Sequence, residues 1–203
     1  MKTMRLASVT AICLLAATAW AQHEGHNMGG MPKDSKMAPQ SQQAMMQGMM
    51  QDVQELRALK GEEREQTFLT KMMDHHQSGI DMAKMALTKS KNPKILAESK
   101  KIITDQTKEI GEMRQHLSAK HNVTRAAKPD PRMQPMMQKM MAMSGAEFDR
   151  MFANDMTMHH QGAIDMSQVV VTGGVPHKEV QSLASKIIEG NRRSQKSLKQ
   201  AVS

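Results

Sequence analysis

The strongest constraint in this sequence is an internal repeat at a spacing of 84 residues. Residues 68–82 match residues 152–166 at eight of fifteen positions, and both copies carry the segments His-His-Gln and Ile-Asp-Met. Apolar residues within each copy recur at steps of three and four, which is the spacing of one helix face. A duplicated unit of this kind predicts two similar halves, each of which we expect to be a helical hairpin.

Turn signals divide each half into two helices, so the chain is predicted to be an all-α four-helix bundle. Residues 92–93 (Asn-Pro) and 172–174 (Thr-Gly-Gly) are typical of the junction between two helices. Ser144 and Glu147 have the spacing of a capping box, in which both side chains bond free amide groups at a helix start. The expected helices span residues 62–90, 94–119, 146–172 and 177–200.

The segments outside these helices complete the expected organisation. Residues 1–21 have the pattern of a signal peptide, with a basic start, an apolar run and small residues before a cut after Ala21. The mature protein is therefore expected in the periplasm or outside the cell, with no transmembrane segment. A flexible Met/His-rich arm is expected over residues 22–60, with a short helix near 43–59. The bundle is expected over 61–201. Its two units, about 61–119 and 145–201, are joined by a linker over 120–144.

Composition removes several classes of function. The only cysteine, Cys13, falls within the expected signal peptide, so the mature chain can have neither a disulfide nor a thiolate site. Three phenylalanines, no tyrosine and evenly spread basic residues argue against nucleic-acid binding despite a net charge of +8. Methionine is abundant instead, with 24 residues. It can be a soft core filler, but that role does not explain methionine crowded with histidine and glycine.

The repeat places paired histidines and methionines on the apolar side of two expected helices. The candidate metal ligands in the repeat are Met72, His75, His76, Met82, Met156, His159, His160 and Met166. Met113 and His116, one turn apart on the second expected helix, are further candidates. A buried imidazole needs a polar partner, which can be a metal ion or a neighbouring side chain such as Gln77 or Asp81.

Thioether sulfur and imidazole together point to copper. Thioethers suit soft Cu(I) and Ag(I), and imidazole suits copper in either oxidation state. A basic chain with few carboxylates is a poor trap for calcium or magnesium. Methionine and histidine also gather at residues 23–31, 45–50 and 133–143. For the last of these clusters, core filling and a partner-binding helix are the alternatives to metal binding.

The doubled Met-x-x-His-His-x-small-x-Ile-x-Met block resembles the family called domain of unknown function 305, which includes CopM-like periplasmic copper-resistance proteins. The similarity covers about residues 61–201, and Ser78-Gly79 stands where the block more often has Gly-Ala. The resemblance implies a ferritin-like four-helix bundle that binds Cu(I), and also Ag(I), outside the cytoplasm. All eight repeat ligands occupy positions that match the family block.

The leading hypothesis is a non-enzymatic copper-binding protein that sequesters or passes on Cu(I) and contributes to copper tolerance. Its expected partners are the metal ion and other periplasmic copper-handling proteins. A ferritin-like metal oxidase is one alternative, but the Glu-x-x-His motif of such bundles does not occur in the sequence. A second alternative is a helical adaptor or Met-rich oxidant sink that uses its methionines without a metal.

Overall fold

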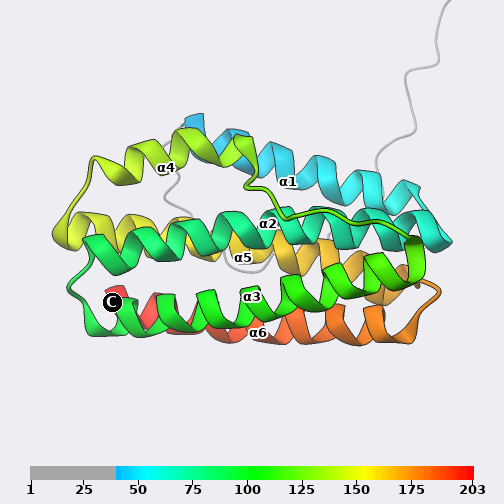
Figure 1. Ribbon diagram of the computed structural model, residues 1–203. Helices are drawn as coiled ribbons and strands as arrows, with labels where there is room; N and C mark the ends of the chain where they lie inside the picture. Colours follow the sequence, from blue (N-terminus) through cyan, green and yellow to red (C-terminus); the bar gives the residue numbers. More distant parts are fainter. Residues whose placement is uncertain (1–39) are drawn as a thin grey trace, which may run out of the picture. The chain divides into compact units, whose positions relative to one another are not determined.

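The computed structural model describes residues 40–203, and within that range the chain is built only of helices (Figure 1). The all-α fold expected from the sequence is confirmed for this part. The expected signal peptide and residues 22–39 of the expected arm lie outside the described residues. The elements are α1 (Gln40–Ala58), α2 (Gly61–Lys89), α3 (Pro93–His121), the short 3₁₀ helix η1 (Pro131–Met133), α4 (Gln134–Met141), α5 (Gly145–Gly173) and α6 (Lys178–Val202).

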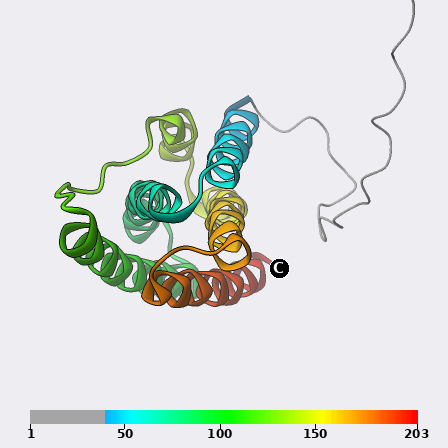
Figure 2. The same cartoon turned by 90° about the vertical axis from the view of Figure 1, so that its right-hand side faces the viewer.

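The helices of residues 40–203 lie in three layers (Figures 1 and 2). The middle layer holds α2 and α5, which carry the two copies of the repeat and pack against each other. On one side of it lie α3 and α6, each joined to its middle-layer neighbour as a hairpin, and on the other side lie α1 and α4. Arg64 near the start of α2 donates to the carbonyl of Gly174 after the end of α5. The two repeat helices are therefore antiparallel.

Local chemistry explains most of the helix ends. The Asn92 side chain accepts the amide of Lys94 at 3.0 Å, and Pro93 occupies the first turn, where its missing N–H is harmless. The capping box expected at Ser144 is wrong, because that side chain makes no cap hydrogen bond. The chain enters α5 through Gly145 at φ 59° and enters α2 through the equivalent Gly61 at φ 55°, a conformation that suits glycine.

Helix α1 is longer than the short helix expected near 43–59, and it packs on both α2 and α5. Its Met45 and Leu56 are buried, with 2% and 0% of their surface exposed. The linker expected over 120–144 contains η1 and α4, whose Met136 and Met140 are also buried. Core packing thus accounts for part of the methionine cluster at 133–143, although Met141 stays 52% exposed.

Two apolar clusters fill the interior, and the paired histidines lie between them. On α2 the first cluster includes Met72 and the second includes Met82, on either side of the first histidine pair. On α5 the order is reversed, with Met156 in the second cluster and Met166 in the first, as an antiparallel crossing requires. None of the helices in residues 40–203 combines the length and hydropathy needed to cross a membrane.

Candidate metal centre

The two His-His-Gln segments meet where α2 and α5 cross. The rings of His75 and His159 are stacked, with centroids 3.7 Å apart and planes inclined by 28°. The Nε2–H of His159 donates to the backbone carbonyl of His75 at 3.0 Å. Both copies of the repeat therefore contribute to one location in the middle layer.

The second histidine of each pair is oriented by the layer of α3 and α6. His76 Nε2 lies 2.7 Å from the carboxylate of Glu109 on α3. His160 Nε2 lies 2.8 Å from the hydroxyl of Ser194 on α6, and that hydroxyl donates its own hydrogen to Glu98. Since both oxygens act as acceptors, each Nε2 carries a hydrogen, and the neutral form of either ring has its lone pair on Nδ1.

These oxygen partners are not the ones expected from the sequence. The amide of Gln77 donates to Asp81 at 3.0 Å, so these two side chains bond to each other and not to the buried imidazoles. Residues 77 and 81 are one helical turn apart and share a face of α2. The actual partners come from two other helices, which the pattern of a single helix cannot reveal.

Five ring nitrogens of the two histidine pairs are buried without a hydrogen-bond partner among residues 40–203. They are both nitrogens of His75 and the Nδ1 atoms of His76, His159 and His160. Burial lowers the pKa of His75, His159 and His160 well below its usual value, and the charge of neighbouring imidazoles lowers it further. The rings of His75, His159 and His160 are therefore neutral at pH 7, and each offers a lone pair to a metal ion.

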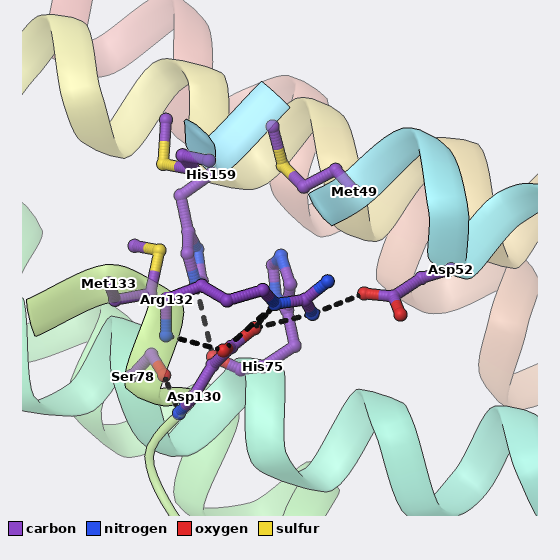
Figure 3. A pocket seen from close by; sticks show the side chains of 9 residues that line it. Met49, Asp52, His75, Ser78, Asp130, Arg132, Met133 and His159 are labelled. Atoms are coloured by element: carbon purple, nitrogen blue, oxygen red, sulfur yellow. Dashed lines mark hydrogen bonds and ion pairs between the residues drawn. The ribbon is translucent and has the colours of Figure 1, made fainter. Parts of the chain in front are cut away.

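A cavity of about 10 Å³ opens between His75, His159 and the layer of α1 and η1 (Figure 3). That space suits one water-sized sphere, so it can admit a single ion but no organic ligand. The other residues that line it are Met45, Met49, Asp52, Ser78, Asp130, Arg132 and Met133. Two of the methionines come from α1 and one from η1, and all three belong to clusters outside the repeat.

Charged and small residues shape this cavity. Arg132 forms ion pairs with Asp52 on α1 and with Asp130, both at 2.6 Å, and its side chain runs across the space in front of His75 (Figure 3). A side chain at Gly162 would collide with the sulfur of Met49 and lie 3.2 Å from Nε2 of His75. Because Gly162 has no Cβ, the sulfur of Met49 and Nε2 of His75 can both lie close to the backbone of α5.

The methionines of the repeat lie beside the imidazoles, within the apolar clusters. Met82 and Met156 belong to one cluster, and Met72, Met113 and Met166 belong to the other. All five are almost completely buried. The structure thus brings the four predicted histidines to one level of the bundle and places these predicted methionines above and below that level.

The remaining candidate, His116, lies in a different cluster. Its Nε2 is 2.9 Å from Oε1 of Glu65 on α2, and the same oxygen lies 2.9 Å from His121 Nε2 and 2.7 Å from His177 Nδ1. The four ligand atoms lie within 4.8 Å of one another, so this group could hold a metal ion. Its other members are widely separated in the sequence and outside the repeat, which is why sequence reasoning missed them.

The carboxylate at the centre of this cluster is ionised. Burial alone would raise the pKa of Glu65, which has no exposed surface. The hydrogen bonds from the backbone of His177 and from the three imidazoles outweigh that effect and lower the pKa below its usual value.

The fold is similar to that of CopM, a protein whose structure has been solved with bound copper. CopM in its Cu(II)-bound form matches with a TM-score of 0.60 and 29% identity, over 68% of this chain and 95% of CopM. The Cu(I)-bound form matches with a TM-score of 0.58 and 31% identity, over 67% of this chain and 93% of CopM. A silver-bound form of CopM matches with a TM-score of 0.57 and 32% identity, over 67% of this chain and 92% of CopM. The resemblance to CopM-like proteins expected from the histidine block is confirmed.

The fold is also shared with a DUF305 protein from Streptomyces coelicolor, at a TM-score of 0.55 and 20% identity over 64% of this chain and 86% of that one. No curated protein matches this chain. The family model described as "Domain of unknown function (DUF4142)" matches residues 50–176, which is more than half of the sequence. The chain therefore belongs to the DUF4142 family and is a relative of CopM.

Proposed function

We propose that this protein is an exported copper-binding protein that sequesters or passes on Cu(I), with Ag(I) as a second soft cargo ion. One observation carries the proposal. In the part of the chain that the structure describes, the two histidine pairs present five buried ring nitrogens without partners, beside a cavity that three methionines also line. An unpartnered buried polar atom is unfavourable, and a bound ion would satisfy it.

The orientation of the histidines supports metal binding over simple core packing. In His76, His159 and His160 one ring nitrogen donates to an oxygen, and the other is buried without a partner among residues 40–203. Metal-binding histidines in proteins commonly show this arrangement, because the second hydrogen bond fixes the tautomer and the ring orientation. A core histidine that only needed hydrogen bonds would have its second nitrogen paired as well.

The sulfur atoms around the site favour a soft monovalent ion. Met45, Met49 and Met133 line the cavity directly. The repeat methionines flank the imidazole level and remain candidate ligands, since methionine has three rotatable bonds and can turn its sulfur without moving a helix. Thioethers bind Cu(I) and Ag(I) well and bind hard cations negligibly. CopM, a relative solved with Cu(I), Ag and also Cu(II), supports copper and silver as ions for this fold, and the preference for the monovalent ions rests on the thioethers.

We also propose that the protein acts without catalysis. The two aspartates of the repeat do not form a carboxylate cage, because Asp81 accepts from Gln77 and Asp165 accepts from Gln161 on their own helices. Dinuclear oxidases of bundle folds need inward carboxylates on facing helices. The cavity is also limited to the size of one ion.

Export and a role in copper tolerance are part of the proposal. The basic and apolar pattern of residues 1–21 is that of a secretory signal. Thioethers are well suited to hold Cu(I) in a compartment that oxidises free thiols. The cargo would then be exchanged with other copper-handling proteins of the same compartment.

A competition titration tests the site. The full chain competes with a chromophoric Cu(I) chelator, and we compare wild type with a variant in which His75, His76, His159 and His160 are all alanine. The variant should lose more than about 100-fold in affinity, and the control Gln77→Ala/Gln161→Ala on the other helix face should not lose affinity. Circular dichroism checks that the variant is folded. Equal competition by wild type and the folded variant rejects the site.

Growth under copper stress separates this role from an oxidant sink. Cells that express the histidine variant should tolerate less copper than cells that express wild type. Equal protection by both would favour a role of the methionines as oxidisable groups.

A further inference from the structure

One end of the bundle carries a second group of convergent donors that the repeat does not explain. Glu65 lies near the start of α2, His116 and His121 lie in the last turns of α3, and His177 precedes the first residue of α6. At the offset of 84 Glu65 corresponds to Asp149, and at an offset of 85, which allows for a one-residue slip in the later helices, His116 and His177 correspond to Ala201 and Asn92, so neither histidine recurs. The cluster is therefore not a consequence of hairpin packing, which both halves share.

One carboxylate oxygen in this cluster accepts three hydrogen bonds, one more than its lone pairs favour. Three ring nitrogens lie 2.7–2.9 Å from the same Oε1 of Glu65, while Oε2 accepts the backbone N–H of His177 at 3.0 Å. A carboxylate oxygen has about two lone-pair directions. Two donors to Oε1 would be enough to stabilise the buried carboxylate of Glu65. The third imidazole is therefore not explained by the stability of that carboxylate.

The rings also approach in a way that suits coordination. His177 meets His116 edge to face at 77° and meets His121 at 83°. None of the three pairs is stacked, and each ring directs one nitrogen toward the same point. Ligand atoms within 4.8 Å of one another need only small shifts to surround an ion at 2.0–2.2 Å.

We propose that Glu65, His116, His121 and His177 form a separate site for a divalent transition-metal ion, Cu(II) ahead of Zn(II), through three imidazole nitrogens and one carboxylate oxygen. The donor set contains no sulfur, so it does not favour Cu(I) or Ag(I). A single carboxylate is too little for calcium or magnesium. Among divalent ions, the usual order of affinity places Cu(II) above Zn(II).

An entry path leads to this site from the surface. His177 is 27% exposed and His116 13% exposed at the side chain, whereas Glu65 is fully buried. A groove between α3 and α6 reaches His116, and its lining includes Glu112, Glu179 and Lys120. The two glutamates supply negative charge along the approach of a cation.

The test is a calorimetric titration of the full-length apoprotein with Zn(II). His23 and His26 are changed to alanine in every sample, so that these histidines near the N-terminus do not compete. The wild-type site should take one Zn(II), and Glu65→Gln and His116→Gln should each weaken it at least about tenfold. Gln77→Ala/Gln161→Ala, whose side chains bond to Asp81 and Asp165 on their own helices, is the matched control and should bind Zn(II) as wild type does. Cu(II) should displace the bound Zn(II), and its electron paramagnetic resonance spectrum should show imidazole nitrogen couplings.

Several outcomes would overturn the assignment. It fails if wild type binds Zn(II) and Cu(II) no more tightly than folded Glu65→Gln or His116→Gln. If Glu65→Gln does not fold, the partly exposed His116→Gln decides alone. Zn(II) that Cu(II) cannot displace rejects the stated preference. The same end variants should compete for Cu(I) like wild type, so failure at this end leaves the central Cu(I) site untouched.

Discussion

The middle and the end of the bundle both gather histidines, but they leave the ring nitrogens in opposite states. In the middle, the Nδ1 atoms of His76, His159 and His160 are buried and have no partner in the described chain. At the end, three imidazoles converge on Glu65, and their hydrogen bonds are made. A metal ion in the middle would therefore satisfy groups that are otherwise unsatisfied, whereas an ion at the end must replace existing hydrogen bonds.

The donors around the two groups differ as well. The middle combines imidazoles from the repeat with thioethers from α1 and η1, and the end combines three imidazoles with a carboxylate. In the two proposals donor softness divides the ions between the two regions, with monovalent copper and silver assigned to the middle and divalent ions to the end. The same residue type, histidine, can serve both because imidazole accepts soft and borderline metals.

The largest expected effect is the loss of Cu(I) from the middle site alone. His75→Ala/His159→Ala removes both stacked rings, and the Cu(I) affinity should fall by more than about 100-fold. Loss of a residue that only hydrogen-bonds to a metal ligand costs up to about 100-fold, and loss of the ligands themselves should cost more. The measurement is competition with a chromophoric Cu(I) chelator. If the comparison between the two regions is right, Glu65→Gln leaves this affinity unchanged, and an equal loss in both variants would contradict it.

Silver should stabilise the folded protein through the middle site. An ion present at 100 times its dissociation constant contributes about 2.7 kcal/mol. For a chain of this size that corresponds to a rise in Tm of roughly 5–10 °C, which differential scanning calorimetry can resolve. The rise should be absent in His75→Ala/His159→Ala. An identical rise in that variant would mean that silver binds elsewhere.

A single sulfur should matter only in the middle. Met49→Leu keeps an apolar side chain of similar volume but removes a thioether from the cavity. We expect the Cu(I) affinity to fall on the order of tenfold and Zn(II) binding at the end to stay at the wild-type level. Parallel titrations with the two ions check this. Unchanged Cu(I) binding would remove Met49 from the ligand set.

The smallest expected effect tests the space beside His75. Gly162→Ala places a Cβ against the sulfur of Met49, which must then move. We expect a loss of about 1 kcal/mol in the free energy of unfolding, the lower end for overpacking, with weaker Cu(I) binding. Gly190→Ala in α6 is the matched control, since nothing lies within 4 Å of its added Cβ. Chemical denaturation of both variants should rank Gly162→Ala as the less stable.

Sequence periodicity predicted the long helices because each carries an apolar face that must be buried. The four repeat helices expected from residue 62 onward agree with α2, α3, α5 and α6 to within two residues at each end. The capping box at Ser144 failed because its spacing takes no account of the positive φ of Gly145. Helix entry there depends on one backbone angle, and a side-chain motif does not report that angle.

The site was predictable only in part, for a physical reason. The repeat identified His75 and His159, because duplicated residues on antiparallel helices meet near the crossing point. It did not identify Glu109 and Ser194, which orient the other ring of each pair from α3 and α6. Partners that come from different helices depend on how those helices are packed, and no local spacing encodes that. The cluster around Glu65 was missed for the same reason.

The most direct measurement is an anomalous-difference map from crystals of the full chain grown with Cu(I) under a reductant and recorded at the copper absorption edge. The account predicts a copper peak between α2 and α5, within bonding distance of a ring nitrogen of His75 or His159 and of a methionine sulfur. Copper found only at other positions, with the five buried ring nitrogens still unpartnered, would contradict it.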